Sequence, residues 1–359
     1  MHPETTRRVA QVRHAALSLM ARTVAVPYWR FLVRNVSILF MLHRFEDSER
    51  GVEGVTSANL RSNLAFLRRH RFRLASFRDL LAEQHRGEEP SKPLVLFTVD
   101  DGHAEFATVA APVFAEFECP VTVFLTTGPI DGATWFWWDK VDYAISTTSR
   151  SELRIEIGGE TTLWPLMAPR DRTLAIAGIV EKLKVIPNEA KLGALAALAE
   201  RVGVDLPTAP PARHAAMSWA DVRKCASTGV TFGPHTVTHP MLSQITDSQA
   251  EWEILESWRR LRAECDATVP VFCYPNGVYS PRDVGILRHT DLVAAVTTKP
   301  HYASRRVSLA SASDGRFHLP RFAYPTDHAQ FVAIVTGLDR VNAFVRQGRA
   351  GWSTIGTAS

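Results

Sequence analysis

The sequence predicts an α/β fold with a parallel sheet or an α/β barrel at its centre. Short apolar runs alternate with helical segments along most of the chain, which is the pattern of repeated strand–helix units. The run at residues 93–99 is continuously apolar, as expected for a strand that is covered on both faces. Of the 359 residues, 46% are hydrophobic and 22% are charged, so a full core can form without disulfides.

The individual elements follow from the periodicity of the apolar residues. Strands are expected at residues 37–42, 93–99, 121–126, 230–232, 269–274 and 292–297. Helices are expected at residues 57–70, between the strand at 93–99 and about residue 117, at 218–228, at 246–264 and from 280 onward. Three helix starts carry capping signals: Ser57, Thr246 with Gln249, and Ser280 before Pro281.

Residues 150–216 interrupt this alternation. Residues 153–157, followed by two glycines, predict a hairpin, and the Ala/Leu-rich residues 171–202 predict helices interrupted at Pro187. We interpret residues 150–216 as a mostly helical insertion, which either covers the mouth of a site or packs against the outside of the barrel. The other expected units are a basic N-terminal helical segment (1–36), the α/β domain (37–149 and 217–327), and a C-terminal helix and tail (328–359).

Charge and cysteine content exclude some function classes. The net charge of +4 is mild, and no Lys/Arg block with interleaved aromatic residues indicates nucleic-acid binding. The four cysteines form no CxxC pair and no Cys/His metal spacing, which is typical of buried thiols in a reducing compartment.

The N-terminal residues 7–34 are basic and partly apolar. Arg22 interrupts the apolar run, and Pro27 and Arg30 follow, which does not match a signal peptide or a membrane span. We interpret the segment as a surface helix, with an interfacial helix on anionic lipid as the alternative. We therefore expect a cytoplasmic protein, with peripheral contact at the inner membrane face as an option.

Two adjacent carboxylates, Asp100 and Asp101, come directly after the apolar run that ends at residue 99. Catalytic side chains gather at strand ends of α/β folds, and neighbouring carboxylates repel each other unless a cation or a proton intervenes. A metal ion would allow one Asp to act as ligand and the other as base. An Asp-Asp-Gly sequence is also a common turn.

A second feature is the pair His235 and His239, which follows another expected strand. Their spacing of four would place both imidazoles on one face of a helical turn, and two His with one carboxylate form a familiar set of ligands for a catalytic divalent metal. A structural His pair is the alternative. A third feature is the tight turn Tyr274-Pro-Asn276-Gly, whose exposed peptide N–H groups could stabilise an oxyanion. The alternative is a turn without a functional role.

These three segments together resemble the polysaccharide deacetylase family, the NodB-homology group of carbohydrate esterase family 4. Residues 98–102 (TVDDG) match its first motif, residues 235–240 (HTVTHP) match its second, and residues 274–277 occupy the place of its third. The resemblance covers roughly residues 37–325. It implies a distorted (β/α) barrel with fewer than eight full units and one divalent metal ion, zinc first, with cobalt or nickel as alternatives.

The resemblance also implies roles for individual residues. Asp100 would be the general base, whereas Asp101, His235 and His239 would bind the metal. Tyr274 and Asn276 would contact substrate, with the peptide N–H near Asn276 helping to hold the oxyanion.

Two departures from the family pattern change the expected site. Cys273 stands where the family carries an Arg that orients the base, and Arg321 is our candidate to replace it, with a structural arginine as the alternative. The usual late Leu-x-His motif of the general acid is absent. Residues 41–44 (MLHR) resemble the permuted bacterial subgroup, in which this His lies near the start, so His43 is the expected acid; a structural His is the alternative.

The expected function is hydrolysis of an N-acetyl group from an amino sugar in a glycan or glycan precursor, in surface polysaccharide biosynthesis. The expected substrates are nucleotide-linked, lipid-linked or oligosaccharide sugars. An O-acetyl esterase and a catalytically silent carbohydrate-binding protein are the alternatives. The cluster of Trp135, Trp137 and Trp138 either lines a sugar cleft or belongs to the core.

Overall fold

The computed structural model describes residues 30–33, 36–86, 93–304 and 314–340. Most of the expected N-terminal helical segment and the tail after residue 340 lie outside these residues. The one element described before residue 36 is a short 3-10 turn, η1 (Arg30–Val33). In the described part of the chain, no helix is both long enough and apolar enough to span a membrane.

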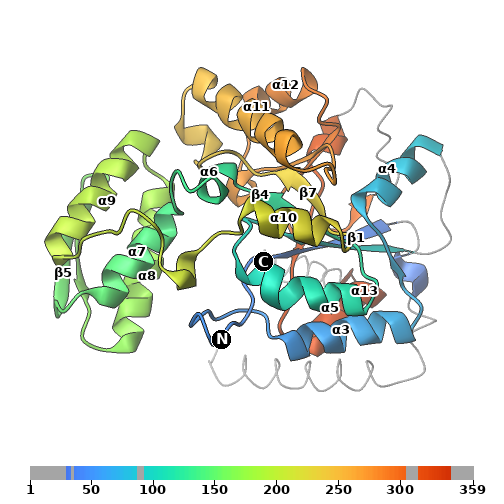
Figure 1. Ribbon diagram of the computed structural model, residues 1–359, viewed down its shortest axis with the longest axis horizontal. Coiled ribbons are helices and arrows are strands. Elements are labelled where there is room, and N and C mark those ends of the chain that lie inside the picture. Colours follow the sequence, from blue (N-terminus) through green and yellow to red (C-terminus); the bar gives the residue numbers. More distant parts are fainter. Residues whose placement is uncertain (1–29, 34–35, 87–92, 305–313, 341–359) are drawn as a thin grey trace, which may run out of the picture.

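A mostly parallel sheet forms the centre of the molecule (Figure 1). Its strands are β1 (Val36–Leu42), β2 (Arg73–Leu74), β3 (Leu94–Val99), β4 (Val121–Leu125), β7 (Thr231–Pro234), β10 (Ala303–Ser304) and β11 (Phe322–Ala323). The order is β10-β1-β3-β4-β7, with β11 paired to β1 and β2 paired to β3, and the β1–β10 pair alone is antiparallel. A separate parallel pair consists of β8 (Val271–Cys273) and β9 (Ala294–Val296).

Two isolated bridges connect the separate pair to the main sheet. Phe232 bridges to Thr268, just before β8, and Val296 in β9 bridges to Leu319, just before β11. Because β11 pairs with β1, the strands follow one another around a curved arrangement. The predicted α/β class with a mostly parallel sheet is confirmed, and its regular strand pairing is interrupted at these two bridges.

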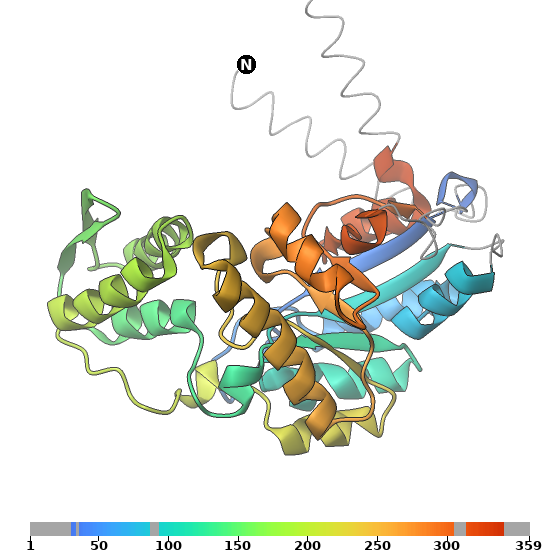
Figure 2. The ribbon, with the colours of Figure 1, turned by 90° about the horizontal axis from the view of Figure 1, so that it is seen from above.

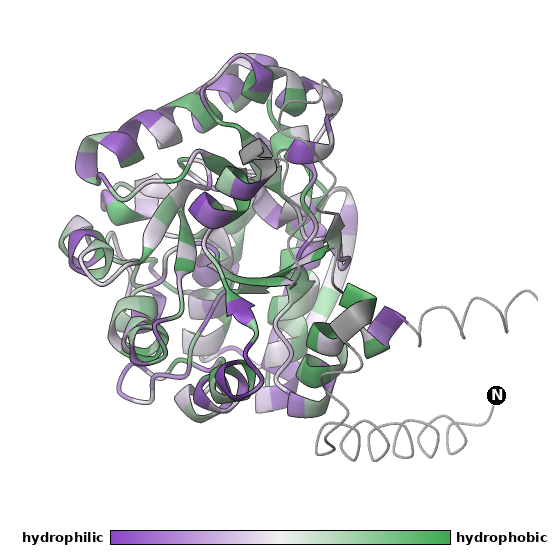
Figure 3. Ribbon diagram, turned by 90° about the vertical axis from the view of Figure 1, so that its right-hand side faces the viewer, coloured by the Kyte–Doolittle hydropathy of each residue, from purple (hydrophilic) through white to green (hydrophobic). Residues whose placement is uncertain are grey.

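Alternate residues of the central strands face two different apolar clusters. In β1, Ile38 and Phe40 belong to the cluster under the helices, whereas Leu39 belongs to the other. The second cluster unites strands that are not neighbours, so it fills the concave side of the sheet; its members include Leu39, Leu96, Phe124, Val271, Ala294, Val296 and Leu319. Strands that are buried on both faces have no polar side, which explains the continuous apolar runs. Figure 3 shows mainly hydrophobic residues on the inner strands, whereas the outer helices carry both polar and hydrophobic residues.

The helices around the sheet are α3 (Ser57–Arg69), α4 (Phe77–Arg86), the π-helix η2 (Phe106–Ala110), α5 (Ala111–Glu116), α6 (Thr127–Ile130), α10 (Trp219–Ala226), α11 (Asp247–Glu264), α12 (Pro281–Arg288) and α13 (His328–Thr336). Most of them pack on its outside, whereas α4 contributes Phe77 and Leu80 to the cluster on the concave side. Short 3-10 turns are η3 (Ala212–His214), η4 (Leu242–Gln244), η5 (Pro275–Gly277) and η6 (Asp314–Phe317).

The helix caps agree with the sequence at two of the three predicted starts. Thr246 and Gln249 form the capping box of α11, and Ser280 caps α12. The predicted cap Ser57 is wrong by one residue, because the hydroxyl of Thr56 accepts the hydrogen bond from Asn59 N at 3.0 Å. Thr56 keeps the extended backbone that an N-cap residue adopts.

The segment around residues 150–216 forms a lobe beside the sheet (Figures 1 and 2). The lobe contains α7 (Trp137–Thr147), the hairpin of β5 (Glu152–Ile157) and β6 (Glu160–Pro165), α8 (Pro169–Lys184) and α9 (Asn188–Val202). It has its own apolar cluster, to which α7 contributes Val141 and Ile145. In terms of packing, the lobe therefore begins with α7, before residue 150.

Gly233 in β7 lets β8 approach closely. A Cβ at this position would lie 2.6 Å from the Val271 carbonyl oxygen and 2.7 Å from the Phe124 ring. We expect Gly233→Ala to lower the free energy of unfolding by about 1–3 kcal/mol, because the added methyl group overpacks the core. Gly285→Ala is the control: it lies in α12 with nothing within 4 Å, and should stabilise by about 0.5–1 kcal/mol. Denaturant unfolding measures both, and equal stabilities would contradict this packing.

Candidate active site

The side chains singled out in the sequence meet at the carboxyl ends of the parallel strands. His43 follows β1, Asp100 and Asp101 follow β3, His235 follows β7, and Asn276 lies in the turn after β8. All five line one cavity of about 600 Å³, whose other wall is formed by residues of α7 and α8. This is the end of an α/β sheet at which ligands bind, because the loops there are free to vary.

Asp101, His235 and His239 bring three ligand atoms together. The two His Nε2 atoms are 3.2 Å apart, and they lie 3.6 and 3.5 Å from the same Asp101 oxygen. A tetrahedral zinc ion with ordinary bond lengths needs neighbouring ligand atoms ~3.3 Å apart. All three residues are buried. The spacing and the donor types therefore fit one divalent ion of the zinc class.

The loop that carries the two histidines is not helical. The predicted helical turn is wrong, because Thr236 (φ 67°) and His239 (φ 57°) adopt left-handed backbone conformations. The rings still meet, since the loop folds back on itself and the Thr236 hydroxyl accepts a hydrogen bond from His239 N. His235 Nδ1 lies 2.7 Å from the Cys273 carbonyl oxygen, which directs its Nε2 toward Asp101.

Asp100 is held by Arg321. The guanidinium donates to both carboxylate oxygens, at 2.6 and 2.7 Å, and also to the Thr98 hydroxyl at 2.9 Å and the Thr297 carbonyl at 3.0 Å. Arg321 is fully buried on the concave side of the sheet, with its guanidinium 5.6 Å from the centre of the Phe124 ring. The structure therefore places Arg321 where the family arginine would be needed. Burial raises the pKa of Asp100, but the charge and hydrogen bonds of Arg321 outweigh it and lower the pKa overall.

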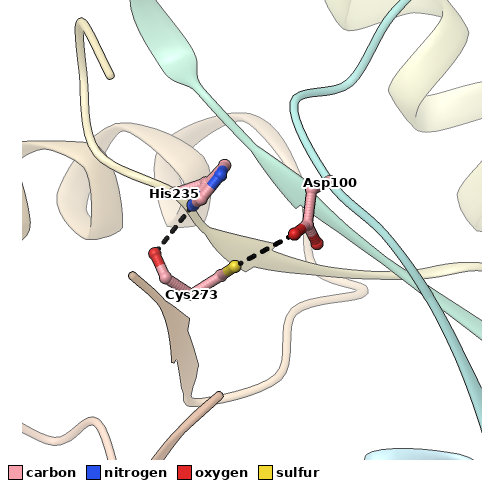
Figure 4. Close-up of side chains that lie close together, drawn as sticks. All are labelled: Asp100, His235 and Cys273. Carbon is pink, nitrogen blue, oxygen red and sulfur yellow. Dashed lines mark hydrogen bonds between the residues drawn. The ribbon is translucent and has the colours of Figure 1, made fainter. Parts of the chain in front are cut away.

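Cys273 connects the two halves of the site (Figure 4). Its carbonyl accepts from His235, and its thiol lies 3.5 Å from an Asp100 oxygen. Burial raises the pKa of the thiol, so it stays protonated and donates to the carboxylate. A small side chain at this position also leaves room for Arg321, whose guanidinium is 3.2 Å from the sulfur.

The remaining predicted residues have different positions. His43 is half-exposed in the cavity, with Nε2 3.8 Å from Asp100. Asn276 lines the cavity and has a left-handed backbone (φ 53°). Tyr274 does not line it: its ring stacks on Tyr279 in the core and its N–H bonds to the Val296 carbonyl. The predicted contact of Tyr274 with substrate therefore finds no support in its position.

The three tryptophans divide between core and cavity. Trp135 is buried and packs edge-on against Tyr143. Trp137 and Trp138 line the cavity, and the Trp138 ring stands edge-on to His239 with 4.6 Å between ring centres. Trp137 is also buried and belongs to the apolar cluster of the lobe, so it lies both in that core and in the cavity wall.

One wall of the cavity was not predicted from the sequence. Arg44 pairs with buried Glu105 at 2.5 Å and lies 3.7 Å from Asp139, which in turn lies 3.2 Å from His214. Except for Glu105, these residues line the cavity. They come from four distant segments and form no spaced motif, and the position of Arg44 beside His43 is the one signal that the sequence offered.

Comparison with known proteins finds a matching family model and similar folds. The family model described as polysaccharide deacetylase matches residues 201–295. The resemblance to that family is confirmed. The Streptococcus pyogenes deacetylase PplD, solved in complex with acetate, has the same fold, with a TM-score of 0.54, 16% identity, and coverage of 84% of this chain and 98% of that one. IcaB from Ammonifex degensii is similar, with a TM-score of 0.50, 15% identity and coverage of 84% and 97%. No curated protein sequence matches the chain.

The ion pair between Arg321 and Asp100 predicts a measurable coupling in stability. Arg321→Met leaves a buried carboxylate unpaired, so we expect it to lower the free energy of unfolding by about 3–5 kcal/mol. The same change in an Asp100→Asn background should have a smaller effect, because the amide carries no charge. Denaturant unfolding of the four proteins in chelator gives the coupling energy, and additive effects would contradict a direct pair.

The three-ligand cluster predicts stabilisation by zinc. An ion that binds the folded but not the unfolded chain raises the free energy of unfolding by about 2.7 kcal/mol when its free concentration is a hundred times Kd. His239→Ala should lose this gain. His289→Ala, an exposed His on the far end of α12, should keep it. Unfolding with zinc and with chelator makes the comparison, and a gain retained in His239→Ala would exclude this ligand set.

Proposed function

We propose that this protein is a metal-dependent carbohydrate N-deacetylase, which removes an acetyl group from an amino sugar and releases acetate. The observation that carries the proposal is the buried carboxylate of Asp100, held by Arg321 beside three ligand atoms with the spacing of a single ion. A general base next to a metal site is the arrangement that water-mediated amide hydrolysis requires. The match to the polysaccharide deacetylase model supports the same class of reaction.

Asp101, His235 and His239 are the proposed ligands of one divalent ion, zinc first. When bound at such a site, the ion acts as a Lewis acid and lowers the pKa of a coordinated water.

The residues of the chain itself account for the proton transfers. Asp100 accepts the proton of the attacking water, and Arg321 fixes the direction of its carboxylate. As the water oxygen bonds to the acetamide carbon, the peptide N–H of Asn276 donates to the developing oxyanion. His43 then donates a proton to the sugar nitrogen as the C–N bond breaks, which leaves acetate and a free amine.

The choice of an amide over an ester rests on His43. An amine leaves only when it is protonated, so an N-deacetylase needs a proton donor on the open side of the cavity. His43 is half-exposed there and lies close to Asp100. Among enzymes, the alternative is an esterase that removes O-acetyl groups from carbohydrates. The close spacing of the ligand atoms favours an enzyme over a silent binding protein.

As substrates we propose nucleotide-linked, lipid-linked or oligosaccharide forms of an N-acetylated sugar, in the biosynthesis of a surface polysaccharide in the cytoplasm. The cavity supports a sugar substrate, since its volume suits a small ligand and Trp137 and Trp138 offer ring faces or edges. Contact of the basic N-terminal segment with an anionic membrane surface would suit the lipid-linked form.

An acetate-release screen tests the proposal. Purified protein is incubated with N-acetylated sugar nucleotides, glycolipid precursors and chito-oligomers, and with matched O-acetyl sugars, in the presence of zinc, cobalt or nickel. Acetate from an N-acetyl sugar supports the proposal. Release from O-acetyl sugars alone identifies the esterase, and no release with any metal, together with sugar binding, identifies the silent binding protein.

Asp100→Asn should lower acetate release by about 10²–10⁴-fold, because the amide cannot accept the water proton. Zinc binding should persist, since Asp101, His235 and His239 are unchanged. Asp205→Asn, an exposed residue after α9, is the matched control and should keep wild-type turnover. Near-normal turnover of Asp100→Asn in a folded protein would refute its role as the base.

A further inference from the structure

The loop between the two histidines is anchored by a carboxylate from another element. Glu253 on α11 is 5% exposed and accepts from the backbone N–H of Val237 at 2.7 Å and of Thr238 at 2.9 Å. It also accepts from the Thr238 hydroxyl at 2.5 Å. Successive N–H groups that converge on an anion form a nest, and hydrogen bonds to a charged acceptor are stronger than neutral ones.

This loop needs external anchoring. Non-glycine residues in left-handed conformations, such as Thr236 and His239, persist only where the surroundings fix them. The Nδ1 atom of His239 has no hydrogen-bond partner among the described residues, so no bond to its second nitrogen orients the ring. The orientation of His239 therefore depends on ring contacts and on the backbone that Glu253 holds.

We propose that Glu253 is a positioning residue for the loop of residues 235–239, so that α11 sets the affinity of the site for its divalent ion. The inference rests on the proposed ligand set of Asp101, His235 and His239. Glu253 would not itself be a ligand, because its carboxylate is occupied by the backbone and hydroxyl of the loop.

Zinc affinity of the full-length protein tests the inference, measured by competition with a chromophoric chelator. Glu253→Gln keeps the size of the side chain but removes its charge and one acceptor, and we expect about 10- to 100-fold weaker binding. The absorption spectrum of the cobalt-substituted protein should shift in Glu253→Gln, because the geometry around His239 relaxes.

A matched variant controls for charge and helix. Glu256→Gln removes the charge of a partly exposed carboxylate on the same helix, which pairs with Arg259 instead of the loop. This variant should bind zinc as the wild type does.

The possible outcomes separate this inference from the proposed function. Wild-type zinc affinity in folded Glu253→Gln overturns the inference, even if the variant unfolds more easily, because the role of Glu253 is then only structural. No zinc binding by the wild type overturns the ligand set itself and the inference with it. Should Glu253→Gln fail to fold, Thr238→Val removes one bond of the same set, and unchanged zinc affinity in that variant overturns the inference.

Discussion

The buried contact between Arg321 and Asp100 is the interaction around which the rest of the site is arranged. A carboxylate that is this deeply buried needs a cation, and the guanidinium meets both of its oxygens from the concave side of the sheet. Arg321 is fixed in turn by Thr98 and by the Thr297 carbonyl. Asp100 is thereby held in one orientation, while the adjacent Asp101 faces the two histidines.

Cys273 explains how an arginine from a different segment can serve this purpose. The small thiol leaves space beside Asp100, and the segment that leads into β11 fills it with Arg321. Arg321 can reach this place only because the sheet is curved. The bridge from β9 to Leu319 and the pairing of β11 with β1 hold the segment of Arg321 so that its side chain points inward. The fold and the chemistry are linked at this point, since a flat sheet would keep these segments apart.

The lobe gives the cavity its second wall. Its helices α7, α8 and α9 pack around their own apolar cluster, and α7 and α8 contribute residues to the cavity opposite the metal-ligand loop. Trp138 on α7 stands edge-on to His239, with 4.6 Å between the ring centres. A change in the lobe can therefore reach His239 through packing without any change in the sheet.

The sequence by itself determined the α/β class, most of the elements and the central side chains, because apolar periodicity and the TVDDG and HTVTHP motifs are local signals. It also indicated Arg321 and His43, through the resemblance and its departures. The tertiary structure decided that Arg321 reaches Asp100, that the His loop is left-handed instead of helical, and that Tyr274 belongs to the core. It alone brought in Glu253 and the Arg44–Asp139–His214 wall. These contacts join residues that are distant in sequence, so no local pattern can encode them.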